Sequence, residues 1–298
     1  MKALSNILQD ILFQFRISGG LIARLSCVGA YYSVYTFHRI RGLDRDRSRL
    51  RAVAATSRLG ASRREVTILL PDGSQMTLDL MAASFLPKEF ISERTYTKLP
   101  QFLPRPGQTI VDVGAHQGMF SIPAARQVGP DGKVISIEPH PDNLKRLTRN
   151  KEANGIKHLC IVPVAAANFS GATDFFVTPL GSGGHSLFIR SEGDLIAQRD
   201  SIPIQARKLD DILQDAGVFQ PDLIKIDVEG AALSVLDSAP RTLASRPRLI
   251  LEVEGTQKEM QQVRRYLEAR GYQTTQFDSI LYAESGTQRH SPESALTA

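Results

Sequence analysis

Residues Thr109–Phe120 are T-I-V-D-V-G-A-H-Q-G-M-F, an apolar run that ends on an acid and opens into a glycine turn. This order predicts a buried strand, a tight loop and then a helix. Gly114 and Gly118 let the backbone turn sharply and approach a ligand, where a Cβ atom would collide with the loop or the ligand. We therefore expect a small molecule at this loop, near the free N–H groups of the helix that follows.

The glycine spacing argues against two common nucleotide sites. A P-loop needs a Gly-Lys-Ser/Thr ending and a dinucleotide site needs G-x-G-x-x-G, and this stretch has neither. A nicotinamide-dependent oxidoreductase therefore stays a minor alternative. The D-x-G-x-x-x-G pattern from Asp112 to Gly118 instead resembles the first motif of S-adenosylmethionine-dependent methyltransferases.

The composition is that of a globular protein with one large core. The chain has 298 residues, 42% hydrophobic and 22% charged, which gives no reason to expect wholesale disorder. A domain of about 200 residues with an N-terminal extension fits this length. Cys27 and Cys160 form neither a disulfide framework nor a zinc-binding pattern, so we expect no zinc site and a reducing, cytoplasmic location.

Residues 1–64 are predicted to be a basic, helical extension. Apolar residues recur at helical spacing from Leu4 to Phe15, and the apolar stretch from Leu21 to Phe37 is too short for a membrane span and is interrupted by Arg24. No secretory signal is recognisable. We expect these helices to pack on the core or on a second copy of the chain, with peripheral membrane contact through residues 1–60 as the alternative.

Arginines crowd between residues 39 and 64 and supply much of the net charge of +5. We expect a solvated helix face, because Asp44 and Asp46 lie among the arginines. Attraction to anionic lipid is the alternative. Nucleic acid is not an expected partner, because no aromatic residues alternate with the arginines.

The chain continues with a lead-in segment, residues 65–103, before the main domain of residues 104–284 and a polar tail of residues 285–298. Glu65–Leu70 and Gln75–Leu80 flank the turn sequence P-D-G-S and predict a β-hairpin. Helical segments are expected from Glu89 to Leu103.

Alternating strands and helices follow the glycine loop and predict βαβ units. Gly132–Pro139 is a second strand, whose terminal Glu138 can accept hydrogen bonds from both ribose hydroxyls of a nucleoside. A third strand, Ile161–Ala166, would bring Ala166 and Asn168 near the adenine ring. Short strands at 171–176 and 202–206 flank a glycine-rich loop, residues 181–187, that could serve as a substrate lid.

The fourth strand, within Asp222–Gly230, ends in two acids beside the glycine loop. Of these acids, Asp227 is the first candidate to accept or orient a substrate proton, Glu229 the second, and His185 of the glycine-rich loop the third. Helix capping or pairing with Lys225 is the structural alternative for Asp227. A helix over 233–243, a strand over 248–254, a helix over 258–271 and a closing strand region over 272–283 complete the domain.

The motifs V-D-V-G-A-H-Q-G, I-S-I-E-P-H-P-D-N, K-I-D-V-E-G-A and L-I-L-E-V-E occur in this order. With them, the chain from about Val66 to Ala283 resembles the FkbM family of S-adenosylmethionine-dependent methyltransferases. The resemblance implies an α/β, Rossmann-like class I methyltransferase fold whose seven-strand sheet is mostly parallel with one antiparallel strand. It also implies O-methylation of a hydroxyl on a sugar, polyketide or other small metabolite. The expected cofactor-binding residues are Asp112, Gly114, Ala115, His116, Gly118, Glu138, Ala166 and Asn168.

Two departures from the family pattern affect the site. Ala232 stands where the family often has an acid, and Asn168 stands where an acid often lies near the adenine. The first departure supports the alternative of a non-catalytic cofactor-binding or scaffold protein. His116 is expected to fix the loop rather than to transfer protons. A divalent metal between Asp227 and Glu252 or Glu254 is chemically feasible, but the spacing does not require one, and we predict no metal site.

Overall fold

The computed structural model describes residues 65–177 except Glu93, residues 200–253, residues 256–286 and a few single positions elsewhere. Most of the predicted extension, the glycine-rich loop apart from Leu187, and the tail beyond Gly286 lie outside the described residues. Within the described part, no helix has the length and apolar character needed to cross a membrane.

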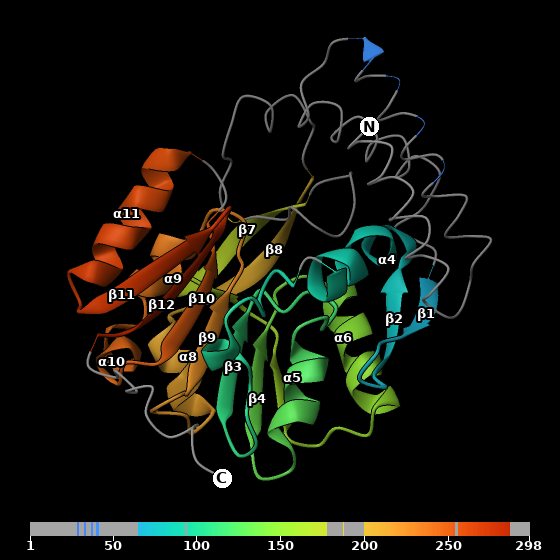
Figure 1. Cartoon of the computed structure of the whole chain (residues 1–298), viewed down its shortest axis with the longest axis horizontal. Coiled ribbons are helices and arrows are strands. Elements are labelled where there is room, and N and C mark those ends of the chain that lie inside the picture. The colour runs from blue at the N-terminus through green and yellow to red at the C-terminus, as the bar shows by residue number, and fades with distance from the viewer. Residues whose placement is uncertain are drawn as a thin grey trace, which may run out of the picture.

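A seven-stranded sheet organises the described chain (Figure 1). Its strands are β3 (Thr109–Val113), β4 (Lys133–Ile137), β5 (Leu159–Val162), β9 (Leu223–Ile226), β10 (Arg248–Glu252), β11 (Tyr272–Phe277) and β12 (Ile280–Ser285). They follow the order β11-β12-β10-β9-β3-β4-β5. β12 is antiparallel to both neighbours, and the other neighbouring pairs are parallel. This arrangement confirms the predicted α/β fold with one antiparallel strand.

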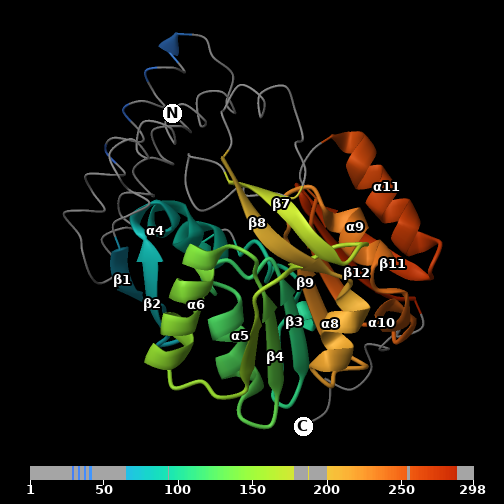
Figure 2. The same cartoon turned by 180° about the vertical axis from the view of Figure 1, so that it is seen from behind.

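Helices cover both faces of this sheet. One face carries α5 (Ser121–Val128) and α6 (Pro141–Ala153), and the other carries α8 (Leu209–Asp215), α9 (Ala232–Asp237), α10 (Pro240–Ala244) and α11 (Gln257–Glu268). Alternation along the strands separates the two cores, because Ile110 of β3 packs with α5 whereas Val111 and Val113 face the other layer. Figure 2 shows α6 and α11 on opposite sides of the molecule.

The register aligns the carboxyl ends of four neighbouring strands. The pairs at this level are Leu251 with Ile226, Ile226 with Val113, and Val113 with Ile137. The residues directly after these paired positions therefore form one row along the edge of the sheet: Glu252, Asp227, Gly114 and Glu138. This row lies where the strand order changes direction, which is the usual ligand-binding edge of an open α/β sheet.

The predicted hairpin is confirmed as β1 (Glu65–Leu69) and β2 (Gln75–Asp79), and α6 binds its free edge. Asn150 accepts from the N–H of Thr77 at 2.6 Å and donates to its carbonyl at 3.1 Å, and Asn154 makes the same pair of bonds with Gln75. Four helical residues rise about 6.0 Å and two strand residues about 6.6 Å, so the two asparagines match alternate residues of the strand.

The hairpin also contacts the glycine loop through a buried pair of side chains. Asp79 donates its N–H to Oε1 of Gln117 at 3.0 Å, and Nε2 of Gln117 donates back to the Asp79 carboxylate. Asn150 donates to the main-chain oxygen of Gln117 at 2.8 Å. Gln117 and Asn150 are fully buried. The hairpin therefore supports the loop from the side of α6.

The segment between the hairpin and β3 differs from the prediction. A helix, α4 (Leu80–Pro87), begins directly after β2, because the carboxylate of Asp79 accepts the N–H of Ala82 at 2.8 Å and caps it. A short π-helix, η2 (Lys88–Ser92), and a 3₁₀ turn, η3 (Pro100–Phe102), follow. The residues between η2 and η3 are not helical where the structure describes them.

Two further predictions are corrected where a proline interrupts the chain. The expected strand over Ile161–Ala166 stops at Val162 before Pro163, and Ala165–Ala166 forms β6 in a separate sheet with β7 (Gly171–Val177) and β8 (Asp200–Arg207). The expected helix over residues 233–243 is split into α9 and α10 before Pro240. Proline lacks the N–H that a continuous ladder or helix would need.

The asparagine bridge yields a test of stability. We expect Asn150→Ala to lower the free energy of unfolding by about 1–3 kcal/mol, because it leaves the part-buried main-chain groups of Thr77 and the buried carbonyl of Gln117 without their Asn150 partner. Urea denaturation of the full chain measures this loss. Asn154→Ala is the matched control, because its bonds to Gln75 are solvent-exposed and water can replace them. Equal losses in the two variants would contradict this assignment.

Candidate functional site at the carboxyl edge of the sheet

The loop after β3 packs tightly against the end of β9. Gly114 has a φ of 79°, and a Cβ atom there would lie 1.8 Å from the main-chain oxygen of Asp227. Gly118 has a φ of 91°, and its Cβ would lie 2.6 Å from Cδ1 of Leu147 in α6. The sequence predicts that a Cβ atom at these positions would collide with the loop or with a ligand. In the structure, the collision is with the protein itself, at the end of β9 for Gly114 and in α6 for Gly118.

The main-chain donors at the start of the loop bond to the neighbouring strand. The N–H groups of Gly114 and Ala115 donate to the carbonyl of Ile137 at 2.9 and 3.0 Å. The N–H of His116 donates to Oε2 of Glu138 at 2.8 Å. His116 has a φ of 51°, a conformation that is uncommon outside glycine. Its bond to Glu138 supports the prediction that His116 shapes the loop.

Glu138 lies at the end of β4, where the sequence predicts the acid that binds ribose. It is 5% exposed, and its Oε1 accepts from the N–H of His140 at 2.9 Å and from Nδ2 of Asn143 at 3.3 Å. Burial disfavours the charged form of Glu138, whereas hydrogen bonds from His140, His116 and Asn143 favour it. Burial is the larger effect and raises the pKa of Glu138 to about 7. Glu138 therefore titrates in the neutral range.

The acceptor capacity of Glu138 fits the ribose of S-adenosylmethionine. A carboxylate has about four acceptor positions, and three N–H donors use three of them here. Two ribose hydroxyls can be accommodated if they take the remaining position and replace the longest bond, the one from Asn143. The residues present are thus chemically suited to this cofactor.

A buried ion pair joins β3 to β9 beneath the loop. Asp112 and Lys225 are register partners, and Nζ of Lys225 lies 3.2 Å from Oδ1 of Asp112. Ser121 of α5 donates to the other oxygen of Asp112 at 2.6 Å. The sequence predicts a direct contact between Asp112 and the cofactor. The side chain of Asp112 is fully buried, so we infer that it supports the loop from beneath the site.

Lys225 also links the loop to Asp227. Its Nζ donates to the carbonyl of Gly114 at 3.0 Å and lies 3.2 Å from Oδ2 of Asp227. Burial disfavours the charge of Lys225, but the carboxylates of Asp112 and Asp227 outweigh burial and raise its pKa above the usual value. Lys225 therefore remains a cation at neutral pH.

Asp227 belongs to a second polar cluster, which includes Tyr96 and Glu252. The phenol oxygen of Tyr96 lies 3.0 Å from Oδ2 of Asp227 and makes a short hydrogen bond to Oε2 of Glu252. The side chain of Asp227 is 27% exposed, whereas Tyr96 is buried. Asp227 is thus held by Lys225 and Tyr96, and part of its side chain remains exposed to solvent.

The other predicted site residues lie in different parts of the structure. Glu229 follows Asp227 in a tight turn and has a φ of 50°. Ala166 is buried in β6 of the separate sheet, and Asn168 is exposed and donates its N–H to Oγ of Ser234 in α9 at 3.0 Å. The strand geometry on which their adenine contact was predicted is therefore absent, and that contact stays a prediction. His185 lies outside the described residues.

No group of three or more His, Cys, Asp or Glu side chains suited to a metal ion occurs among the described residues. Asp227 and Glu252 approach the same phenol, but Glu254, the other acid considered for a metal, falls in the gap at residues 254–255. The described contacts of the Asp227 carboxylate are with Lys225 and Tyr96.

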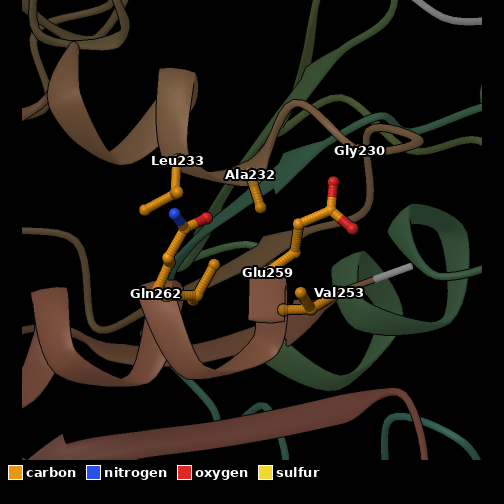
Figure 3. A pocket seen from close by; sticks show the side chains of 7 residues that line it. Gly230, Ala232, Leu233, Val253, Glu259 and Gln262 are labelled. Carbon is orange, nitrogen blue, oxygen red and sulfur yellow. The ribbon is translucent and has the colours of Figure 1, made fainter. Parts of the chain in front are cut away.

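A pocket of about 120 Å³ adjoins the turn after Asp227 (Figure 3). It lies between α9 and α11, and Ala232, the residue that departs from the family pattern, is part of its wall. Figure 3 shows Glu259 pointing toward Gly230 and Gln262 toward Ala232 and Leu233. Typical ligand pockets span about 300–1,000 Å³, so this hollow is too small for a nucleoside cofactor.

The sequence predicts part of the role of two residues and does not identify a third. It predicts Lys225 as a structural partner of Asp227, and a lysine inside the apolar strand L-I-K-I, like Asp112 inside T-I-V-D-V, also indicates a buried pair. It predicts Glu252 only as a feasible metal ligand. Tyr96 lies in an irregular segment between η2 and η3, and nothing in its local sequence identifies it.

Comparison with known proteins agrees with this geometry. The family model described as "Methyltransferase FkbM domain" matches residues 112–274. Methyltransferase sdnD of Sordaria araneosa is 27% identical, and the match covers 55% of this chain and 71% of sdnD. Hexuronic acid methyltransferase AglP of Haloferax volcanii is 28% identical, over 48% of this chain and 54% of AglP. The 31-O-demethyl-FK506 methyltransferase FkbM of Streptomyces tacrolimicus is 25% identical, over 78% of this chain and 97% of FkbM. The chain thus spans about half of AglP and nearly all of FkbM.

The family match begins at the acid beneath the glycine loop and runs into the last strands of the sheet. It covers more than half of the chain, and the chain therefore belongs to the FkbM family of S-adenosylmethionine-dependent methyltransferases.

Proposed function

We propose that this protein transfers the methyl group of S-adenosylmethionine to a hydroxyl of a small molecule, such as a sugar, a polyketide or a similar metabolite. The observation that carries this proposal is the position of Asp227. Its carboxylate is partly exposed at the carboxyl edge of the sheet, next to the glycine loop, and Lys225 and Tyr96 fix its orientation. A fixed carboxylate at this position suits an acceptor that loses a proton.

The residues around the loop support the binding of the methyl donor. Glu138 presents a carboxylate suited to two ribose hydroxyls, and the loop carrying His116 is bonded to the same carboxylate. When bound, S-adenosylmethionine supplies an electrophilic methyl group. The chain's part is to hold the nucleoside at β3 and β4 and to place the acceptor hydroxyl at β9, which is mainly a matter of positioning.

Asp227 would take the proton of the acceptor hydroxyl while the oxygen of that hydroxyl attacks the methyl carbon. The positive charge of Lys225 stabilises the ionised carboxylate before the reaction. Glu229, in the turn that follows, and His185 of the glycine-rich loop remain the second and third candidates for this role.

The names of two relatives support a hydroxylated small molecule as the acceptor. AglP is named for a hexuronic acid and FkbM for 31-O-demethyl-FK506. Identities of 25–28% do not carry the particular acceptor over to this chain. We therefore propose the class of acceptor and the O-methyl product, with the position of the hydroxyl to be found by experiment.

The decisive experiment incubates the full chain with S-adenosylmethionine labelled in the methyl group and with small-molecule extracts of the host. We expect label in a methyl ether, identified by mass spectrometry, and no heat on calorimetric titration with NAD. Binding of S-adenosylmethionine without transfer to any extract would favour the alternative of a non-catalytic cofactor-binding protein.

The raised pKa of Glu138 predicts a pH-dependent affinity for S-adenosylmethionine. Ribose hydroxyls donate to the ionised carboxylate, and below about pH 7 much of Glu138 is protonated. The affinity should therefore rise, by up to about tenfold, as the pH increases from about 6 to about 8. Isothermal titration calorimetry of the full chain measures this change.

Glu138→Gln is the control for this titration, because it keeps the shape and cannot ionise. We expect the variant to bind about 10- to 100-fold more weakly, as for the loss of charged hydrogen bonds worth about 1.5–3 kcal/mol, and to lose the pH dependence that Glu138 causes. If the variant and the wild type have the same pH curve, Glu138 does not bind the ribose.

Replacing Asp227 should separate chemistry from cofactor binding. We expect Asp227→Asn to bind S-adenosylmethionine nearly as well as the wild type but to turn over about 10²–10⁴-fold more slowly, because asparagine keeps the shape and loses the basicity. The measurement is kcat with the acceptor found by labelling. Asp215→Asn, at an exposed acid paired with Arg207, is the control that should keep the wild-type rate. A wild-type rate for Asp227→Asn would move the base to Glu229 or His185.

A further inference from the structure

One buried phenol lies between two carboxylates at the sheet edge. The hydroxyl of Tyr96 contacts Oδ2 of Asp227 at 3.0 Å and makes a shorter bond to Oε2 of Glu252. Asp227 and Glu252 occupy adjacent positions because Ile226 of β9 pairs with Leu251 of β10. The ring is fixed by Phe90, with centroids 5.0 Å apart, and by Phe120, 6.2 Å apart.

The number of hydrogens in this cluster is too small for its contacts. A phenol has one hydrogen to donate, and ionised carboxylates have none. With both acids ionised, Tyr96 can donate to only one of them, and the shorter contact is to Glu252. The contact of Asp227 with Tyr96 then acquires a hydrogen of its own when Asp227 gains a proton. Lys225 holds the ionised form of Asp227, and a proton taken up by Asp227 gives the contact with Tyr96 its hydrogen.

The described charges around Tyr96 come mainly from acids. Lys225 is a cation that the described contacts place here; its Nζ lies 3.2 Å from Asp227 and 5.3 Å from the ring centroid of Tyr96, and it also pairs with Asp112. Glu89 adds a further negative charge toward Tyr96. Burial, Asp227 and Glu252 raise the pKa of Tyr96 well above its usual value, so the phenol stays neutral.

We propose that Tyr96 relays the acceptor proton from Asp227 to Glu252, so that the base of the reaction is a unit of three residues. This proposal rests on the proposed function, in which Asp227 accepts that proton. It adds Tyr96 as a catalytic residue that touches the base, and Glu252 as the group that receives the proton.

The relay balances without a phenolate or an added reactant. The acceptor O–H bond breaks as the O–CH₃ bond forms, and the sulfur of the donor keeps the electron pair of its broken bond to carbon. The proton on Oδ2 of Asp227 moves to the Tyr96 oxygen while the original phenol proton moves to Oε2 of Glu252. Tyr96 is neutral before and after, Asp227 is again a carboxylate, and Glu252 holds the proton.

The surroundings of Glu252 suit the release of that proton. Glu252 is at the last position of β10 and is only partly buried, and Oγ of Ser279 donates to its Oε1 at 3.3 Å. Tyr96 by contrast is 4% exposed. A proton that reaches Glu252 is on a carboxylate that is partly open to solvent, and it can leave before the next turnover.

The first arm of the test uses the full chain without ligand. Tyrosines carry ¹³C at Cζ, and the Tyr96 signal is identified by its loss in Tyr96→Phe. We expect Glu252→Gln and Asp227→Asn each to shift the Tyr96 signal at one fixed pH, because the phenol contacts both carboxylates. A Tyr96 signal that either variant leaves unchanged overturns the coupling.

The second arm measures single-turnover methyl transfer to the acceptor found by labelling. We expect Tyr96→Phe, which keeps the ring, to slow the transfer by at least about tenfold and to change its pH profile, with affinity for S-adenosylmethionine retained. Glu252→Gln should have a similar effect, and the double variant should be no slower than either single variant, because the residues act as a unit. Tyr272→Phe, a buried phenol bonded to the Leu243 carbonyl, is the matched control with the wild-type rate.

The two arms separate failure of the relay from failure of the proposed function. If Asp227→Asn loses turnover while Tyr96→Phe and Glu252→Gln keep the wild-type rate, the relay is wrong and Asp227 remains the base. If the Tyr96 signal depends on Glu252 but no acceptor is ever methylated, the coupling stands and the proposed transfer is wrong. A loss of rate in Tyr96→Phe with an unchanged pH profile assigns Tyr96 to structure alone.

Discussion

The ammonium group of Lys225 holds the carboxyl edge of the sheet together. It neutralises Asp112, which has no exposed surface, binds the first carbonyl of the glycine loop, and pairs with Asp227. Without this cation, the buried Asp112 and the partly exposed Asp227 would lose their neutralising partner, and breaking a buried pair such as Lys225–Asp112 typically costs about 3–5 kcal/mol. The edge therefore depends on an ammonium group that joins two chain segments, residues 112–114 and residues 225–227.

This shared contact fixes the cofactor loop relative to the group proposed to take the proton. The loop cannot shift away from β9 without losing the bond from Lys225 to Gly114, and it cannot move closer because Gly114 already abuts the Asp227 carbonyl. Methyl transfer needs an acceptor oxygen aligned with the methyl group, and small displacements lower the rate strongly. A rigid spacing between the ends of β3 and β9 meets that need.

Much of the sheet could be predicted from the sequence because its strands are apolar runs that end on glycine or an acid. The parallel strands and one antiparallel strand follow from this pattern, as does the position of Glu138. Tyr96 could not be predicted, since its partners are 131 and 156 residues away and only the folded sheet brings them together. The breaks at Pro163 and Pro240 were signalled by the prolines themselves, but the apolar residues around them suggested continuous elements.

The asparagines of α6 have a consequence for the behaviour of the folded chain in concentrated solution. A two-stranded hairpin leaves unpaired N–H and C=O groups that can recruit a strand from another molecule. Asn150 and Asn154 bond these groups at two successive outward positions of β2, so the helix replaces a third strand. An incoming strand would have to displace four hydrogen bonds to pair there, so the outer edge of β2 is protected against intermolecular β-pairing.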